Sequence, residues 1–238
     1  MKKLCLAVLL FLAGTSAVLA AEEPEEFLVS PARTDKTVIP GASLKRPADF
    51  LLQRVKVSSD AREENVRKDE IFETLKLLIA AAARDKTIDL VVLLDARVIP
   101  LKLDSTTVKL SRGSRADTSE TTVVVRTRVV PGASHATELY GKLKAFPNTI
   151  KPAGRSAIDV YGDVDVSIVN PSQYREQVVR LYAADSKLVT STLGAEYRVV
   201  TRGIDRQLQW IRDGMTDVTL FIPYEYDVIP ANVTSYQR

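Results

Sequence analysis

Side chains suited to catalysis are sparse in this sequence. His135 is the only histidine, and it follows Ser134 at the start of a predicted helix, where we interpret it as a surface residue of the first turn. A Ser-His-Asp triad would have to use this one imidazole. The Gly-X-Ser-X-Gly pattern that places a nucleophilic serine on a sharp turn does not occur. These observations disfavour a serine hydrolase.

Three aspartates, Asp159, Asp163 and Asp165, share one face of a predicted strand. Such a group could bind Ca²⁺, which prefers several oxygen ligands, and a pair of carboxylates can hydrolyse a glycosidic bond. Alternating acids also mark the solvated side of a sheet, and no Asp-X-Asp-X-Asp-Gly loop is present. We therefore predict no catalytic residue, no metal ligand and no cofactor, and keep a carboxylate-based hydrolase as the least favoured alternative.

Aromatic residues gather in a predicted C-terminal hairpin and form a candidate binding surface. Trp210 lies in its first strand, and Tyr224 and Tyr226 share one face further along. Strands favour aromatic residues in any case, so packing in the core is the competing interpretation. A ligand-binding protein would line one pocket with these side chains, whereas an assembling protein would hold them in its core or at a flat symmetric contact.

A second candidate surface is a small basic tip between two predicted strands. Arg112 and Arg115 lie within the polar segment 111–119, and could contact phosphate, lipid head groups or a partner. A solvated hairpin loop is the competing interpretation, because charged clusters are common on loops.

The N-terminus has the order of a secretory signal peptide. Lys2 and Lys3 precede an apolar run, which small residues and then acidic residues follow, and this predicts cleavage between Ala20 and Ala21. Cleavage would remove Cys5, the only cysteine, and two of the 33 basic residues, which then nearly balance 30 acidic ones. We expect a protein of the periplasm or exterior, without nucleic-acid binding and without a membrane span after cleavage; retention of the segment as an anchor is the alternative.

The remaining chain divides by composition. Residues 1–20 form the predicted signal peptide, and residues 21–45, rich in Pro, Ser, Thr and charge, predict an extended lead-in. Residues 46–230 carry the regular patterns of one domain, with two sub-lobes as an option, and residues 231–238 form a tail. The elements run strand, helix, strands, helix, strand, helix, strands. Without Gly-rich phosphate loops, this order predicts an α+β fold, a mainly antiparallel sheet with helices packed on one face.

Two helices and one strand are specified most clearly. Residues 60–82 carry an apolar stripe behind Asp60, a predicted cap. Residues 155–169 alternate, which predicts one strand with a buried face and a wet face. Asn170 and Pro171 predict the start of a long helix that Gly194 ends. We expect its apolar stripe to be buried: Tyr174, Val178, Leu181, Tyr182, Leu188, Val189 and Leu193.

Two segments resemble the SIMPL-domain family, also called DUF541 and described as the outer-membrane antigen type. They are "FLLQRVKVSSDAREENVRKDEIFETLKLLIAAA", similar to the family's first strand and helix, and "VDVSIVNPSQYREQVVRLYAADSKLVTSTLGAEYRVV", similar to its strand, turn, long helix and next strand. The resemblance covers roughly residues 49–229. It implies a bacterial envelope or periplasmic protein without an established catalytic activity, and in some members a homo-oligomeric ring.

The sequence thus favours an exported, non-enzymatic SIMPL-like protein that acts by self-assembly or by binding an envelope partner. The principal alternative is a periplasmic module that binds a small ligand through the aromatic hairpin.

Overall fold

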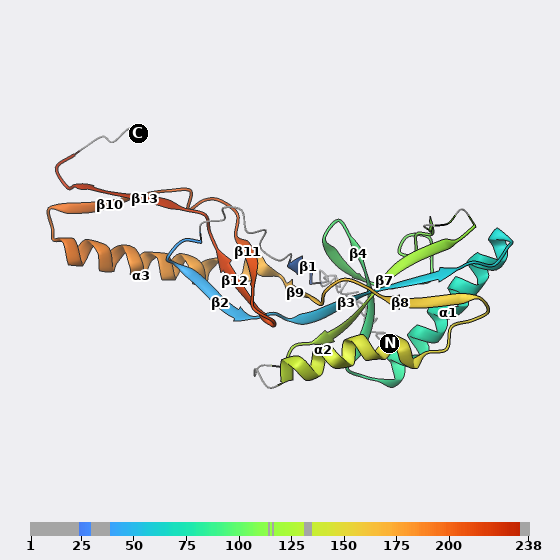
Figure 1. Ribbon diagram of the computed structural model, residues 1–238. Helices are drawn as coiled ribbons and strands as arrows, with labels where there is room; N and C mark the ends of the chain where they lie inside the picture. The colour runs from blue at the N-terminus through green and yellow to red at the C-terminus, as the bar shows by residue number, and fades with distance from the viewer. Residues whose placement is uncertain (1–23, 30–38, 114, 116, 131–134, 234–238) are drawn as a thin grey trace, which may run out of the picture.

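The computed structural model describes residues 24–29, 39–113, 115, 117–130 and 135–233, so the predicted signal peptide lies outside the described residues. These residues form an elongated α+β protein in which every strand pairing is antiparallel (Figure 1). The helices are α1 (Glu64–Arg84), α2 (Ala136–Ala145) and α3 (Arg175–Leu193), with 3-10 turns η2 (Phe146–Thr149) and η3 (Pro171–Tyr174). The strands are β1 (Glu26–Val29), β2 (Ser43–Pro47), β3 (Phe50–Ser59), β4 (Ile88–Leu94), β5 (Arg97–Pro100), β6 (Ser111–Arg112), β7 (Ser119–Arg128), β8 (Ser156–Val160), β9 (Asp165–Val169), β10 (Tyr197–Arg202), β11 (Gln209–Asp213), β12 (Asp217–Phe221) and β13 (Glu225–Pro230).

The largest sheet closes into a barrel. Its strands follow the order β7, β4, β5, β1, β9 and β3, and β3 pairs back to β7 over its full length, from Phe50 opposite Arg128 to Ser59 opposite Ser119. The predicted α+β class with a mainly antiparallel sheet is confirmed, but the main sheet is closed. Since a closed sheet has an inside and an outside, α1 and α2 lie on the outside of the barrel.

The lead-in contributes to this closure. Residues 26–29, which we expected to lack regular structure, form β1 and pair with both β5 and β9. Further along the chain, Ser43–Pro47 forms β2. The polar composition of residues 21–45 does not show this, because β1 is short and is stabilised by strands far away in the sequence.

The strand predicted over residues 155–169 is two strands. β8 and β9 both pair with β3, and residues 161–164 interrupt them at Gly162, whose φ of +70° suits glycine. The predicted wet face is also wrong for Asp165 and Ser167, which are 7% and 0% exposed. On β9 this face is the barrel interior, and alternation alone does not distinguish a polar interior from solvent.

The barrel interior has an apolar layer beside charged pairs. Leu52, Val91, Val98 and Val124 pack together, with Leu28 and Leu93 against them, as a cluster separate from the main core. In such a narrow barrel the side chains fill the interior.

An ion pair crosses the barrel next to this layer. Arg126 on β7 contacts Glu26 on β1, which also accepts a hydrogen bond from the Ser167 hydroxyl. Arg126 lies 4.3 Å from the ring centre of Phe50 as well. Burial raises the pKa of Glu26, while the Ser167 hydrogen bond and Arg126 act in the opposite direction.

The main core lies between the outside of the barrel and the two helices beside it, and it continues to the second sheet through Val218 and Leu220 of β12. Ile71, Leu75 and Leu78 of α1 are fully buried, which confirms the predicted apolar stripe of this helix, and Leu143 of α2 joins them. Neither predicted side-chain cap forms. Asp60 binds Arg155 at 2.8 Å, and Asn170 adopts a left-handed conformation and accepts a hydrogen bond from the Glu25 N–H. Tertiary partners thus replace the local capping bonds.

A second part of the molecule extends away from the barrel (Figure 1). β2 pairs with β12 and β12 with β11, and beyond this sheet α3 runs beside the two-stranded ribbon of β10 and β13. We call α3, β10 and β13 the arm. Among the described residues, no helix is both long enough and apolar enough to cross a membrane.

Shortening a side chain inside the barrel tests this architecture. Leu52, 1% exposed, has little room for its neighbours to relax, so Leu52→Ala is expected to lower the free energy of unfolding by about 2–5 kcal/mol in urea titrations. Leu103→Ala is the control, because Leu103 is 37% exposed and should change stability by less than about 1 kcal/mol. Equal losses in both variants would contradict the packed interior.

Candidate functional site

The structure separates the aromatic residues that the sequence proposed as one surface. Trp210 lies in β11, in the sheet next to the barrel, whereas Tyr224 immediately precedes β13 of the arm and Tyr226 lies in that strand. Arg112 is in β6, paired to the barrel strand β7, and Arg115 is an exposed residue of the following loop. These residues therefore lie at three separate locations and do not form one site.

The tyrosines belong to the base of the arm. Tyr224 is buried, and its hydroxyl accepts a hydrogen bond of 3.2 Å from the Ala42 N–H. The rings of Tyr182 on α3 and Tyr224 meet edge to face, with their centres 4.7 Å apart. The rings of Tyr224 and Tyr226 stack with their centres 6.3 Å apart, which confirms the predicted shared face of these two tyrosines. Burial raises the pKa of Tyr224. This cluster fastens α3 to β13, so it is a packing element.

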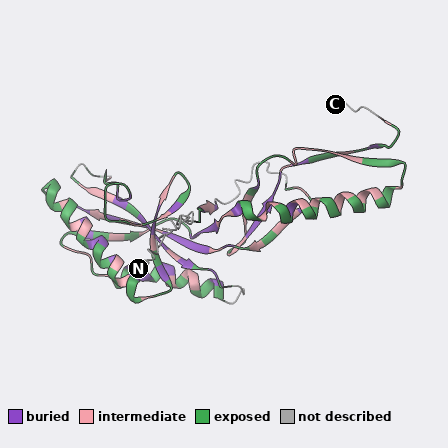
Figure 2. Ribbon diagram, turned by 180° about the vertical axis from the view of Figure 1, so that it is seen from behind, coloured by how far each residue is buried: buried purple, intermediate pink, exposed green. Residues whose placement is uncertain are grey.

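The remainder of α3 lacks such cover. The predicted buried stripe is wrong for most of its members: Val178 is the only residue of this helix that is buried, and Leu181, Leu188 and Leu193 are 41%, 65% and 45% exposed. Figure 2 shows most of this helix in the colours of exposed and intermediate residues. The period correctly predicted an apolar face on this helix. It does not predict what covers the face, and within the described residues nothing covers these leucines.

The ribbon beside α3 is equally incomplete. β10 pairs with β13 from Tyr197 opposite Pro230 to Arg202 opposite Glu225, and the described residues place no third strand on either side. Tyr197, Tyr226 and Val228 are each more than a third exposed. A two-stranded ribbon is marginally stable without packing, so the outer arm has little core of its own.

Trp210 lines a separate pocket at the junction of η3 and the barrel. Its ring centre lies 5.6 Å from that of Phe27 on β1, and the two rings form a tilted pair. The pocket has a volume of about 350 Å³. Besides the two rings, it is lined by Glu25, Asn170, Pro171, Ser172, Arg175, Gln207 and Leu208.

Two of the three carboxylates that the sequence suggested for chemistry lie together beside the barrel strand β9. Asp163 and Asp165 line a pocket of about 550 Å³ with Arg54 and Arg212. Asp165 is 2.9 Å from Arg54 in an ion pair, and burial raises its pKa while Arg54 and Arg212 oppose the shift. Asp165 is thereby held as a counter-ion of an arginine. Asp159 lies on β8, beyond the interruption, and among the described residues no cluster of metal-ligating side chains occurs.

Arg212 in this pocket connects the two parts of the molecule. It donates hydrogen bonds to the Val164 carbonyl at 2.7 Å and to the Tyr140 hydroxyl of α2, as well as to carbonyls of its own turn. The sequence of the C-terminal hairpin predicts its turn at residues 212–214, and the structure places it at residues 214–216: β11 continues to Asp213, and Gly214 follows with a φ of +87°. The turn therefore serves as an attachment of β11 and β12 to the barrel.

The basic tip forms a polar hollow. Arg112 lines a pocket of about 450 Å³ with Arg67 and Lys68 of α1. Arg67 donates hydrogen bonds to the Ala61 and Arg62 carbonyls and to the Ser119 hydroxyl. The guanidinium of Arg67 thus links β7, which borders the tip, to the segment before α1.

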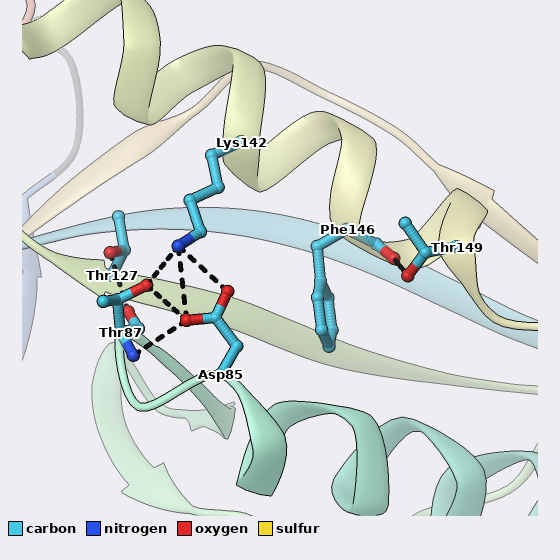
Figure 3. Close-up of polar contacts among 6 residues, drawn as sticks. All are labelled: Asp85, Thr87, Thr127, Lys142, Phe146 and Thr149. Carbon is cyan, nitrogen blue, oxygen red and sulfur yellow. Dashed lines mark hydrogen bonds and ion pairs between the residues drawn. The ribbon is translucent and has the colours of Figure 1, made fainter.

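A groove of about 650 Å³ separates α1 from α2, and an ion pair closes one end of it (Figure 3). Lys142 of α2 lies 2.9 Å from the Asp85 carboxylate, which also accepts hydrogen bonds from the N–H and hydroxyl of Thr87. These hydrogen bonds and Lys142 lower the pKa of Asp85 to about 2. Figure 3 shows Lys142 reaching from α2 to the loop that follows α1, so the pair joins the two helices.

The Asp85 pair predicts a pH dependence. Since the folded pKa is below the unfolded value of 3.8, the stabilisation is complete above 3.8 and is lost as the pH falls toward about 2. Asp85→Asn is expected to lower the free energy of unfolding at pH 7 by about 0.5–1 kcal/mol, because the pair is solvent-exposed. Most of the difference from the wild-type protein should be lost by pH 2, where the folded-state carboxyl is half protonated. Glu73→Gln, which alters an exposed pair within α1, is the control; an Asp85→Asn difference as large at pH 2 as at pH 7 would contradict this role.

Comparison of the chain with models of protein families, with curated proteins and with solved structures gives no match. The resemblance to the SIMPL-domain family therefore remains a prediction from the sequence. The function is inferred below from the geometry of the described residues.

Proposed function

We propose that this chain is an exported, non-enzymatic envelope protein of SIMPL-like architecture that acts by self-assembly through its arm. The observation that carries the proposal is the uncovered apolar face of α3, formed by Leu181, Ala184 and Leu188 at positions i, i+3 and i+7. This spacing is that of a helix face that packs against another helix. The α+β class of the fold and the signal-like order of residues 1–20 in the sequence support the proposal.

The occupant of this face is a second copy of the chain. Leu181 and Leu188 lie symmetrically about the midpoint between Ala184 and Asp185, so a two-fold axis there brings Leu181 opposite Leu188 of the partner subunit in an antiparallel helix pair. Ala184, at the centre, has a small side chain and permits close approach. One patch thus serves both subunits.

The charges on this part of the helix also suit a second copy. α3 carries three basic residues, Arg175, Arg180 and Lys187, against Glu176 and Asp185, and Glu176 and Arg180 form an ion pair at 2.6 Å. Because Arg175 is hydrogen-bonded to carbonyls at the base of the helix, pairing two such helices brings together little excess of one sign. The unpaired edges of β10 and β13 offer further backbone donors and acceptors to the same neighbour.

The expected energy is modest for each residue but adds across the interface. Full burial of a leucine side chain is worth about 1.5–3 kcal/mol, so covering the roughly half-exposed Leu181 and Leu188 contributes about 1 kcal/mol each. In a symmetric dimer each of these leucines is buried once in each subunit, so each contribution occurs twice. This gain would also stabilise the outer arm, which has little core of its own.

Light scattering after size exclusion tests the proposal on the chain from Ala21 onward, over a concentration series. The wild-type protein is expected to show a defined oligomer. Leu188→Glu should raise the dissociation constant of this oligomer at least tenfold, because the variant places two carboxylates in the apolar contact. Leu103→Glu is the matched control, since Leu103 is an exposed leucine outside the arm. A wild-type protein that remains monomeric at every concentration, or a Leu188→Glu variant that assembles like the control, would overturn self-assembly through α3.

A further inference from the structure

We propose that the pocket between Phe27 and Trp210 binds a neutral saccharide, with one sugar ring stacked against the indole. This pocket is independent of the leucine face of α3, so the inference does not rest on self-assembly. It lies where the chain passes from β9 through Asn170 and Pro171 into η3.

The floor of the pocket is apolar and aromatic. Leu208 and Pro171 are buried beneath it, and Trp210 and Phe27 are partly exposed toward the opening. One side of Phe27 is already occupied by the Arg97 guanidinium, 6.0 Å from the ring centre. Trp210 therefore provides the ring on which a ligand can stack. Because the indole is flat, it favours a ligand that has a flat apolar face.

The charged groups around the opening are already paired. Glu25 forms an ion pair with Arg97 at 3.3 Å. Arg175 donates hydrogen bonds to the Arg206 carbonyl at 2.6 Å and to the Ile204 carbonyl at 2.7 Å. An ionic ligand would have to displace these partners, so the pocket does not favour one.

Neutral polar groups remain for a ligand. The side chains of Ser172 and Gln207 line the pocket, are exposed, and make no hydrogen bond to other described residues. A hydroxyl and an amide each offer both donors and acceptors. A ligand with several hydroxyl groups around one flat C–H face satisfies both the rim and the indole, and a pyranose has this chemistry.

The pocket is preformed by a rigid junction. The Glu25 N–H donates to the Asn170 side-chain oxygen, and the Asn170 N–H donates to the Glu25 carbonyl, both at 2.8 Å. Asn170 holds a φ of +45°, which few residues other than Asn and Gly adopt. A volume of about 350 Å³ lies at the lower end of the range for ligand pockets, and suits one or two sugar rings.

Intrinsic fluorescence tests the proposal directly, because Trp210 is the only tryptophan of the chain. The purified protein is titrated with neutral trisaccharides of glucose and of N-acetylglucosamine, and, as ionic comparisons, with a sialylated trisaccharide and with dodecyl sulfate. At least one neutral trisaccharide is expected to change the emission with saturation in the millimolar range or below. Gln207→Ala should weaken this binding about five- to tenfold, which corresponds to one hydrogen bond.

Gln177→Ala is the matched control, because Gln177 is an exposed glutamine of α3 that does not line the pocket. Trp210→Phe, whose binding is measured by calorimetry because the tryptophan is gone, should lose most of its affinity for the saccharide. If Trp210→Phe does not fold, Gln207→Ala still tests the proposal. Absence of saturable binding for every neutral trisaccharide would overturn the proposal. So would preferential binding of an ionic probe, or equal binding by Gln207→Ala and the wild-type protein.

Discussion

The double pairing of β3 is the constraint on which the rest of this structure depends. β3 pairs along its entire length with β7, and its other edge pairs first with β9 and then with β8. Because β9 also pairs with β1, the contact between β3 and β9 closes the barrel. β2 precedes β3 by two residues and pairs with β12, so the same segment also determines where the second sheet joins the barrel.

This closure determines how the chain distributes its apolar surface. Strand residues on the outside of the barrel are covered by α1 and α2, and those on the inside cover one another. The arm, built from the end of the chain, receives no comparable cover, and α3 buries Val178 alone. An extended element that has an apolar face but lacks a core is stabilised by association, and this is the physical basis of the proposed assembly.

Much of the fold could be predicted from local patterns. The period of α1, the glycine that ends α3 and the hairpin of β11 and β12 each depend on residues close together in the chain, and each is confirmed. Barrel closure could not be predicted, because it depends on pairings of β1 with β5 and β9 that join residues as far apart in the chain as Glu26 and Val169. For the same reason Asp165 and Ser167 seemed solvated although they line an interior.

The candidate sites show the same division. The sequence identified Trp210, Tyr224 and Tyr226 as notable by residue type, but only the fold separates the pocket of Trp210 from the packed tyrosines of the arm. Phe27, Ser172 and Gln207 were missed, because no local pattern distinguishes them before η3 and β1 are brought together. Likewise, the helical period predicted the apolar face of α3 but contains no information on whether the covering surface belongs to the same molecule.

Disulfide cross-linking tests the central claim most directly, because the chain from Ala21 onward contains no cysteine. Leu181→Cys and Leu188→Cys variants are mixed under oxidising conditions. An antiparallel α3 pair predicts efficient cross-links between the two variants. Each variant alone should cross-link poorly, since identical positions are then about 10 Å apart along the helix axis, beyond the reach of a disulfide. Cross-linking that is equal in all mixtures, or absent from the mixed pair, would contradict assembly through this face.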